Sequence, residues 1–326
     1  MAFFQTFHYN NADGNDPKAW VVAYTVLVGV VLLAVIPFTF LSLFKSHFGS
    51  DPARRFVPWF KASFVLTLAL VFTQFVITTC IVYNVNVGVE WHAVRAGLHL
   101  GYLAELFRTL SAATVMVFLL ELGPGIYHAI HGISSSFERV IRYLAYFLAF
   151  VVVALAITYY GLLLDVQLNF SNRVGSIHQF GRGPVRIVEV NKLMAATAII
   201  LWVASLAITG LSVYTYLRRK VSPLKTASTL YLAASLLNLL GSTWNFAYAI
   251  HWLLGNGRAD FYPLVLTIIL AWWSRGLLLI ISFCIAVRSG PRGGVWSSGH
   301  KNGSTMYDSV NRDSYATEGT YTSRRV

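Results

Sequence analysis

Seven long apolar segments, separated by shorter polar stretches, limit what this chain can fold into. Each reaches the roughly 20 residues that an α-helix needs to cross about 30 Å of hydrocarbon. The chain is 56% hydrophobic and only 12% charged, whereas about 25% of the residues of a soluble protein are charged. The sequence therefore predicts an all-α, polytopic membrane protein, a seven-transmembrane helix bundle. We expect its helices at residues 20–44, 59–83, 98–122, 141–164, 192–216, 226–254 and 262–287.

The distribution of Lys and Arg predicts how this bundle is oriented. Of the 25 basic residues, 16 lie on the side of the C-terminal tail, 7 lie on the opposite side and the other two lie within helices. Cytoplasmic loops carry an excess of Lys and Arg, so we expect the N-terminus outside and the C-terminus in the cytoplasm. The predicted parts are an extracellular N-terminus (1–19), a helical domain (20–287) and a cytoplasmic tail (288–326). We expect the tail to be disordered, because it is rich in Gly and Ser and has few aliphatic residues.

The longest predicted outer loop, residues 165–190, contains the triplet Asn169-Phe170-Ser171. This is an N-glycosylation sequon, so Asn169 is predicted to be glycosylated. The loop either folds back over the bundle as a lid or stays solvated. The first nineteen residues lack the basic stretch and short apolar core of a cleavable signal peptide, and helix 20–44 is expected to act as an uncleaved signal anchor.

A few ionisable and amide side chains interrupt the apolar segments. Such residues are costly in hydrocarbon and face the interior of a bundle. Glu105 and Arg108 lie three positions apart, on one face of the third segment, and Arg275 lies at a similar depth in the seventh. The same depth estimate brings Gln74 and Asn245 near them. Apolar walls are expected from aromatic residues of the last two segments, which are Trp244, Phe246, Trp272 and Trp273.

Two interpretations of this charged layer remain open. In the first, Glu105, Arg108 and Arg275 form an ion cluster that only locks two helices together. In the second, two arginines and one carboxylate leave a spare positive charge, which favours a small anionic ligand entering from outside. Both hold if the ion cluster is the floor of a pocket.

Several other classes of function find little support in the sequence. The net charge is +12, but the basic residues are scattered between apolar segments, which argues against nucleic-acid binding and for contact with the lipid bilayer. Cys80 and Cys284 lie inside apolar segments, and no helix carries a spaced histidine pair, so no metal or cofactor is predicted. No nucleophile lies beside a base, and we expect no enzyme activity. The run Arg218, Arg219 and Lys220 fits anionic lipid or a cytoplasmic signalling partner.

The first three and last three segments align with each other at offsets of 164 to 170 residues. This pattern indicates two parallel three-helix units joined by the fourth helix. Such a 3+1+3 arrangement is similar to that of sugar transporters of the SWEET type. Those transporters have prolines within several helices, whereas here only Pro37 lies well inside a predicted helix.

In helix number, orientation and Ser/Thr-rich tail, the whole chain resembles seven-helix receptors of the G-protein-coupled type. It also looks like the fungal seven-helix membrane proteins of unassigned function. It departs from those receptors at the inner end of helix 98–122, which lacks their acidic-Arg-Tyr sequence and reads FLLEL at residues 118–122. Helix 262–287 also lacks their Asn-Pro-x-x-Tyr sequence. The last helix also has no lysine for a retinal Schiff base.

These observations lead to three hypotheses. The first is a receptor-like protein that binds a small ligand, anionic by the charge argument, in the outer half of the bundle through Glu105, Arg108, Arg275, Gln74, Asn245 and Trp272. The second is a small-solute transporter or channel built from the two three-helix units. The third is a non-catalytic structural membrane protein. Helices at the long end of the usual range favour the plasma membrane over an endomembrane.

Overall fold

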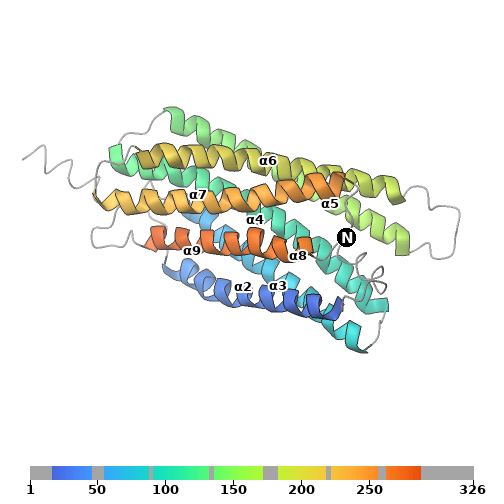
Figure 1. Cartoon of the computed structure of the whole chain (residues 1–326). Coiled ribbons are helices and arrows are strands. Elements are labelled where there is room, and N and C mark those ends of the chain that lie inside the picture. The colour runs from blue at the N-terminus through green and yellow to red at the C-terminus, as the bar shows by residue number, and fades with distance from the viewer. Residues whose placement is uncertain are drawn as a thin grey trace, which may run out of the picture.

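The computed structural model describes residues 17–45, 55–87, 91–131, 136–171, 183–217, 222–255 and 262–287. Within these ranges the chain is helical and forms seven rods (Figure 1). The first five are α2 (Pro17–Lys45), α3 (Val57–Val87), α4 (Trp91–His131), α5 (Ser136–Ser171) and α6 (Gly183–Leu217). The sixth is α7 (Ser222–Tyr248), which continues into η3 (Ala249–Leu254). The seventh runs through α8 (Tyr262–Thr267), η4 (Ile268–Trp273) and α9 (Ser274–Val287). The all-helical prediction is confirmed.

Several helices are longer than the apolar segments that predicted them. We expected the third to end at residue 122, before Gly123 and Pro124, but α4 continues to His131. A proline removes one backbone donor, and here the surrounding turn, residues 121–126, is buried, so packing holds the helix together. The prediction that Pro37 alone lies well inside a helix is therefore wrong.

The predicted outer loop at 165–190 is also shorter than expected. Helix α5 extends to Ser171 and α6 begins at Gly183, so Asn169 lies on the last turn of a helix. The polar ends of both helices gave no apolar signal from which this length could be predicted. The rest of this loop lies outside the described residues, so the lid hypothesis stays a prediction. The run 218–220, most of the predicted N-terminal region and the tail also lie outside the described residues.

The rods pack mainly in chain order and form a closed ring. Each rod contacts the next one, and α9 returns to contact α2. Helix α4 also contacts α6 and α7, and it crosses the bundle at a tilt (Figure 1). Of the most apolar window of α4, 56% is buried, against 22% for α5. Helix α4 is therefore the most enclosed of the candidate membrane spans.

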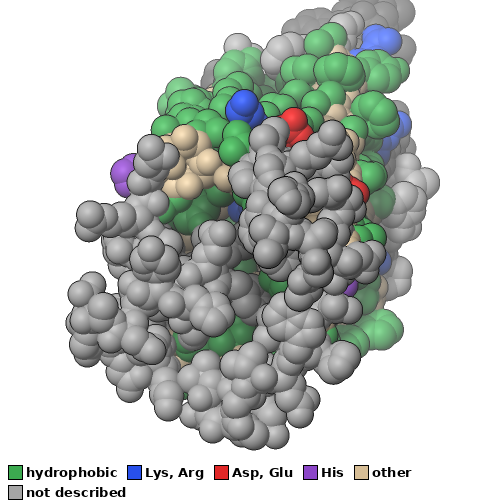
Figure 2. All heavy atoms as spheres, turned by 90° about the vertical axis from the view of Figure 1, so that its right-hand side faces the viewer, with side chains coloured by type: hydrophobic (Ala, Val, Ile, Leu, Met, Phe, Trp, Pro, Cys, Tyr) green, Lys and Arg blue, Asp and Glu red, His purple; other side chains and the backbone are tan. Residues whose placement is uncertain are grey.

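The outer surface of the ring is strongly apolar. Large side chains such as Leu33, Phe44 and Phe150 are more than 70% exposed, which would be unfavourable over so wide an area in water. At the end of the bundle shown in Figure 2, hydrophobic side chains make up most of the described surface, with single charged ones among them. This distribution fits a protein whose sides are solvated by lipid.

Six of the described rods are long and apolar enough to cross a membrane. Helix α7 falls short of this test because polar residues recur along it. They follow a spacing of three, four and seven residues, which places them on one face of the helix: Ser228, Ser235, Asn238, Ser242 and Asn245. The chain is a multi-pass helical membrane protein with six candidate spans, and the seventh rod is the one with a polar face.

Candidate functional site

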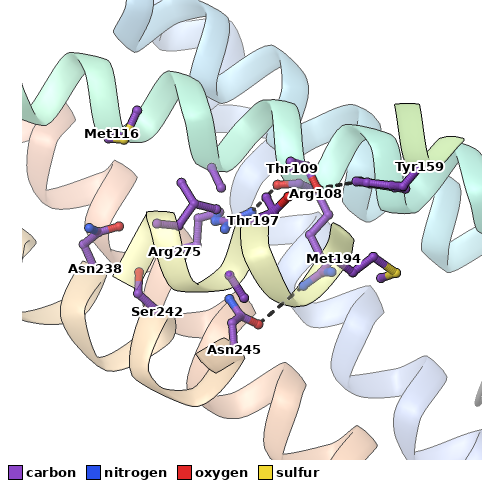
Figure 3. A pocket seen from close by; sticks show the side chains of 13 residues that line it. Arg108, Thr109, Met116, Tyr159, Met194, Thr197, Asn238, Ser242, Asn245 and Arg275 are labelled. Carbon is purple, nitrogen blue, oxygen red and sulfur yellow. Dashed lines mark hydrogen bonds between the residues drawn. The ribbon is translucent and has the colours of Figure 1, made fainter. Parts of the chain in front are cut away.

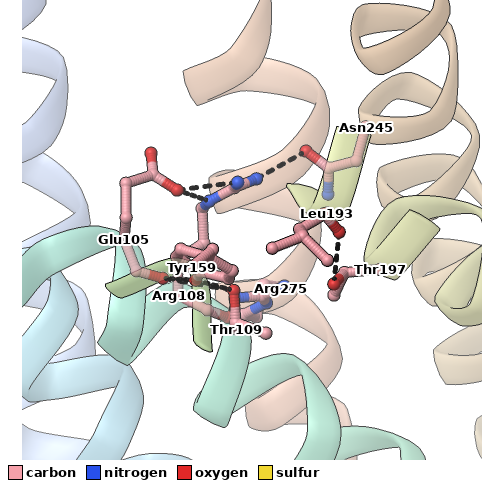
Figure 4. Close-up of polar contacts among 8 residues, drawn as sticks. All are labelled: Glu105, Arg108, Thr109, Tyr159, Leu193, Thr197, Asn245 and Arg275. Atoms are coloured by element: carbon pink, nitrogen blue, oxygen red, sulfur yellow. Dashed lines mark hydrogen bonds and ion pairs between the residues drawn. The ribbon is translucent and has the colours of Figure 1, made fainter. Parts of the chain in front are cut away.

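The ion pair between Glu105 and Arg108 lies on one face of α4. Nε and Nη2 of Arg108 each lie 2.7 Å from Oε2 of Glu105 (Figure 4). The two residues are three positions apart, the spacing that brings side chains together on a helix. Both charges of the pair are therefore matched within α4, without a contribution from another helix.

The guanidinium of Arg108 also reaches α7. Nη1 lies 3.5 Å from the side-chain oxygen of Asn245, a long hydrogen bond that Arg108 donates. Arg108 thus has partners on two helices, and most of its donor groups are in use. The structure brings together four of the predicted site residues here, since Arg275 joins Glu105, Arg108 and Asn245 from α9.

Arg275 enters the site directly after the π-helical segment η4. Its Nη1 donates a hydrogen bond of 3.2 Å to the backbone oxygen of Arg108. The ion pairs among the described residues are Glu105–Arg108 and Glu121–Arg142. No described carboxylate lies within 4.0 Å of the Arg275 guanidinium. The group of Glu105, Arg108 and Arg275 therefore has one positive charge in excess.

A hydroxyl pair holds α5 against α4 beside this group. The hydroxyl oxygens of Thr109 and Tyr159 lie 2.6 Å apart, and that of Tyr159 lies 2.9 Å from the backbone oxygen of Glu105. Tyr159 has one proton, so if it donates to Glu105, Thr109 donates to Tyr159. Tyr159 is 1% exposed, and this contact fixes the side of the site formed by α5.

These residues border a pocket enclosed by α4, α5, α6, α7 and α9 (Figure 3). Its cavity volume is about 40 Å³, so it suits only a small ligand. In Figure 3 Arg275 lies in the middle, among Thr109, Thr197 and Asn238. The other labelled lining residues are Arg108, Met116, Tyr159, Met194, Ser242 and Asn245. The pocket combines polar groups with apolar walls, as small-molecule sites do.

Helix α7 contributes three polar side chains to the pocket, and sequence reasoning selected one of them. Asn238, Ser242 and Asn245 all line it. Within the described part of the chain, neither the amide of Asn238 nor the hydroxyl of Ser242 makes a hydrogen bond. Both groups are therefore available to a ligand. The signal that could have found them is the spacing of polar residues along α7.

Two predicted site residues lie elsewhere. Gln74 donates a hydrogen bond of 3.2 Å to the hydroxyl of Tyr24, which joins α3 to α2. Trp272 is buried in an apolar cluster with residues of α2 and α3, such as Val28 and Val71. Neither lines the pocket. The direction of Trp272 was estimated for a regular α-helix. Trp272 belongs to η4, a π-helical segment whose wider turns point its side chains in other directions.

Trp244 packs against the same apolar cluster as Trp272, and its indole N–H donates a hydrogen bond of 2.9 Å to the hydroxyl of Thr267. Phe246 stacks on Trp202 of α6, with ring centroids 4.6 Å apart. These aromatic residues hold α7 against its neighbours instead of forming the pocket wall. The apolar wall is made by smaller or more flexible side chains, namely Ala112, Met116, Met194, Ala198 and Leu201.

No group of three or more His, Cys, Asp or Glu side chains that could hold a metal ion occurs among the described residues. Comparison of the chain with protein-family models, with curated proteins and with solved structures found no match. The chemistry of the pocket is therefore the main guide to a function.

Proposed function

We propose that this chain is a non-catalytic, receptor-like membrane protein that binds a small anion in the pocket around Arg275. In this proposal α7 is the seventh span, with its polar face turned to the pocket and away from lipid. The N-terminus lies outside and the tail lies in the cytoplasm, as the distribution of basic residues favours.

One observation carries the proposal: the guanidinium of Arg275 faces a pocket and has no carboxylate partner among the residues that the structure describes. An arginine is essentially always charged, and a charge that is removed from water needs a partner. Arg275 makes a hydrogen bond to a backbone oxygen, which orients it but does not neutralise it. A bound anion would supply the missing charge.

A purely structural ion cluster explains these contacts less well. Glu105 and Arg108 already neutralise each other at 2.7 Å within α4, so the ion pair itself joins no second helix. Adding Arg275 to a balanced pair introduces repulsion and a desolvation cost. The hydrogen bond from Arg275 to Arg108 does join α9 to α4, but a neutral donor could do the same at lower cost.

A transporter is the second candidate, and one feature of the packing favours it. Along the chain, α5 follows one group made of α2, α3 and α4 and precedes another made of α6, α7 and α9. The two groups contact each other directly, through α4 with α6 and α7 and through α2 with α9. This is the arrangement expected for two three-helix units joined by a single helix. The pocket lies between the two groups, since both contribute residues to it.

Binding is tested with the purified protein in lipid nanodiscs, using a panel of small organic and inorganic anions at constant ionic strength. We expect saturable thermal stabilisation by at least one anion, about 2.7 kcal/mol at a concentration of 100 times its Kd. Arg275→Leu should abolish this effect, whereas Lys192→Met, which removes an exposed cation of α6, should leave it unchanged. Equal stabilisation of both variants by every anion would contradict the proposal.

The same protein in sealed proteoliposomes separates the two candidates. A receptor-like protein should bind the anion without moving it across the bilayer. Uptake that depends on Arg275 would instead support the transporter.

The orientation predicts which end of the chain is accessible on intact cells. An epitope tag on residue 1 should be detected by antibody without permeabilisation, because the N-terminus is expected outside the plasma membrane. A tag after residue 326 should be detected only after permeabilisation. The reverse pattern would overturn the orientation, and detection of neither tag on intact cells would place the protein in an endomembrane.

A further inference from the structure

We propose that the anion is a small monocarboxylate with a short apolar body. This inference rests on the anion-binding function proposed above. It follows from three features of the pocket, namely its charge, the free edge of the Arg275 guanidinium and the composition of its walls.

The charge of the site favours a ligand with a single negative charge. Glu105 and Arg108 neutralise each other at 2.7 Å, which leaves the charge of Arg275. No other Lys or Arg lines the pocket besides Arg108 and Arg275 among the described residues. A monoanion would bring the site to neutrality. A doubly charged anion such as sulfate would leave one negative charge unmatched in a poorly solvated place, which is unfavourable.

The free edge of the Arg275 guanidinium favours a carboxylate. Its Nη1 is occupied by the backbone oxygen of Arg108 at 3.2 Å. Nε and Nη2 make no hydrogen bond with the described residues. These two nitrogens form one edge of the planar group, and their parallel N–H bonds match the two oxygens of a carboxylate.

The walls suggest what accompanies the carboxylate. Asn238 and Ser242 offer an amide and a hydroxyl near Arg275 (Figure 3), which can hydrogen-bond the carboxylate oxygens or a hydroxyl next to them. The hydroxyl of Thr197 donates to the backbone oxygen of Leu193 at 2.9 Å, so its oxygen can only accept. The aliphatic and thioether part of the lining is Ala112, Met116, Met194, Ala198 and Leu201, and it suits a short hydrocarbon chain.

The test compares propionate with propionamide, sulfate and phosphate on the wild-type protein in nanodiscs at pH 7. Propionamide has a similar shape without the charge, and the two inorganic anions lack the planar carboxylate and apolar chain. We expect propionate to bind at least about tenfold more tightly than each of the other three, since a planar fork recognises a carboxylate bidentately. Arg275→Lys keeps the positive charge but removes the planar pair of N–H donors. It should therefore reduce the preference for propionate over sulfate to less than about threefold.

The outcomes separate this inference from the function on which it rests. If sulfate or phosphate binds more tightly than propionate and still depends on Arg275, the monocarboxylate inference falls while anion binding stands. If propionamide binds as well as propionate, the charge argument fails and the inference falls. If no anion binds in a way that depends on Arg275, both fall. The wild-type comparison gives these answers even if Arg275→Lys does not fold.

Discussion

Replacing Gly123 with valine is expected to give the largest loss of stability of any single substitution considered for this protein. A Cβ atom at this position would lie 2.8 Å from Cδ2 of Leu211 and 2.8 Å from the hydroxyl oxygen of Tyr231. That hydroxyl is buried and donates a hydrogen bond of 3.0 Å to the backbone oxygen of Leu119, so it cannot move freely. Overpacking of a core costs about 1–3 kcal/mol, and we expect Gly123→Val at the upper end.

The measurement is the midpoint of thermal unfolding, together with the fraction of protein that is monodisperse after solubilisation. Gly161→Val is the matched control, because nothing lies within 4 Å of a Cβ atom at Gly161 on α5. Adding Tyr231→Phe to Gly123→Val should cost less than the sum of the two single effects, because it removes the hydroxyl that the new side chain would meet. Strict additivity would show that α4 and α7 are not in close contact at Gly123.

Glu105→Gln is expected to increase the affinity of the pocket for anions. Without the Glu105 carboxylate, the charge of Arg108 is no longer balanced and the site has two positive charges. Unit charges about 8 Å apart interact by about 2 kcal/mol at an effective dielectric constant of 20, which corresponds to roughly thirtyfold in affinity. Sulfate should gain more than propionate, since it carries two charges.

The matched control is Glu189→Gln, which removes an exposed carboxylate of α6 and should leave every affinity unchanged. Both variants are compared by titration with propionate and sulfate in nanodiscs. A lower affinity of Glu105→Gln for both anions, at unchanged thermal stability, would mean that the carboxylate of Glu105 organises the site instead of opposing the anion.

The positions of the helices were predictable because hydrocarbon imposes a simple requirement, about 20 apolar residues for each span. Their ends were less predictable. Helix α4 passes through Gly123 and Pro124, which usually mark a helix end, because the surrounding core holds it. Helix α5 reaches Ser171 through polar residues that no hydropathy pattern distinguishes from a loop. Where the membrane no longer constrains the chain, tertiary packing decides.

The site was predictable to the extent that charge is costly in a membrane. That cost pointed to Glu105 and Arg108, three residues apart on α4, and to Arg275. Gln74 was chosen by depth alone, and the structure places it at another interface, against Tyr24. Depth along a helix does not determine the direction of a side chain around it.

Asn238 and Ser242 lie on the polar face of α7 that lines the pocket, but they were missed because uncharged residues were selected only by their depth relative to the charged ones. The helical spacing of small polar residues is a weaker signal than a charged side chain. It becomes informative only when several such residues share one face of a span that is otherwise apolar.

The most direct test of the account is whether an anion occupies the space beside Arg275. Ser242→Cys places a thiol in the pocket lining, after the two exposed cysteines, Cys80 and Cys284, have been replaced by alanine. Leu240→Cys in the same background is the control, since Leu240 is 46% exposed on the outer surface of the helices and its thiol would face lipid. The rate of modification by a charged, water-soluble methanethiosulfonate reagent is measured with and without propionate.

The account predicts that Cys at position 242 reacts, and that saturating propionate slows the reaction at least about tenfold, as expected for a site that is more than 90% occupied. This protection should disappear in the Arg275→Leu background, and Cys at position 240 should be unreactive throughout. The same measurement is repeated with sulfate and with phosphate. A thiol at position 242 that does not react, or whose reaction none of the three anions slows, would contradict the central claim that this pocket binds a small anion.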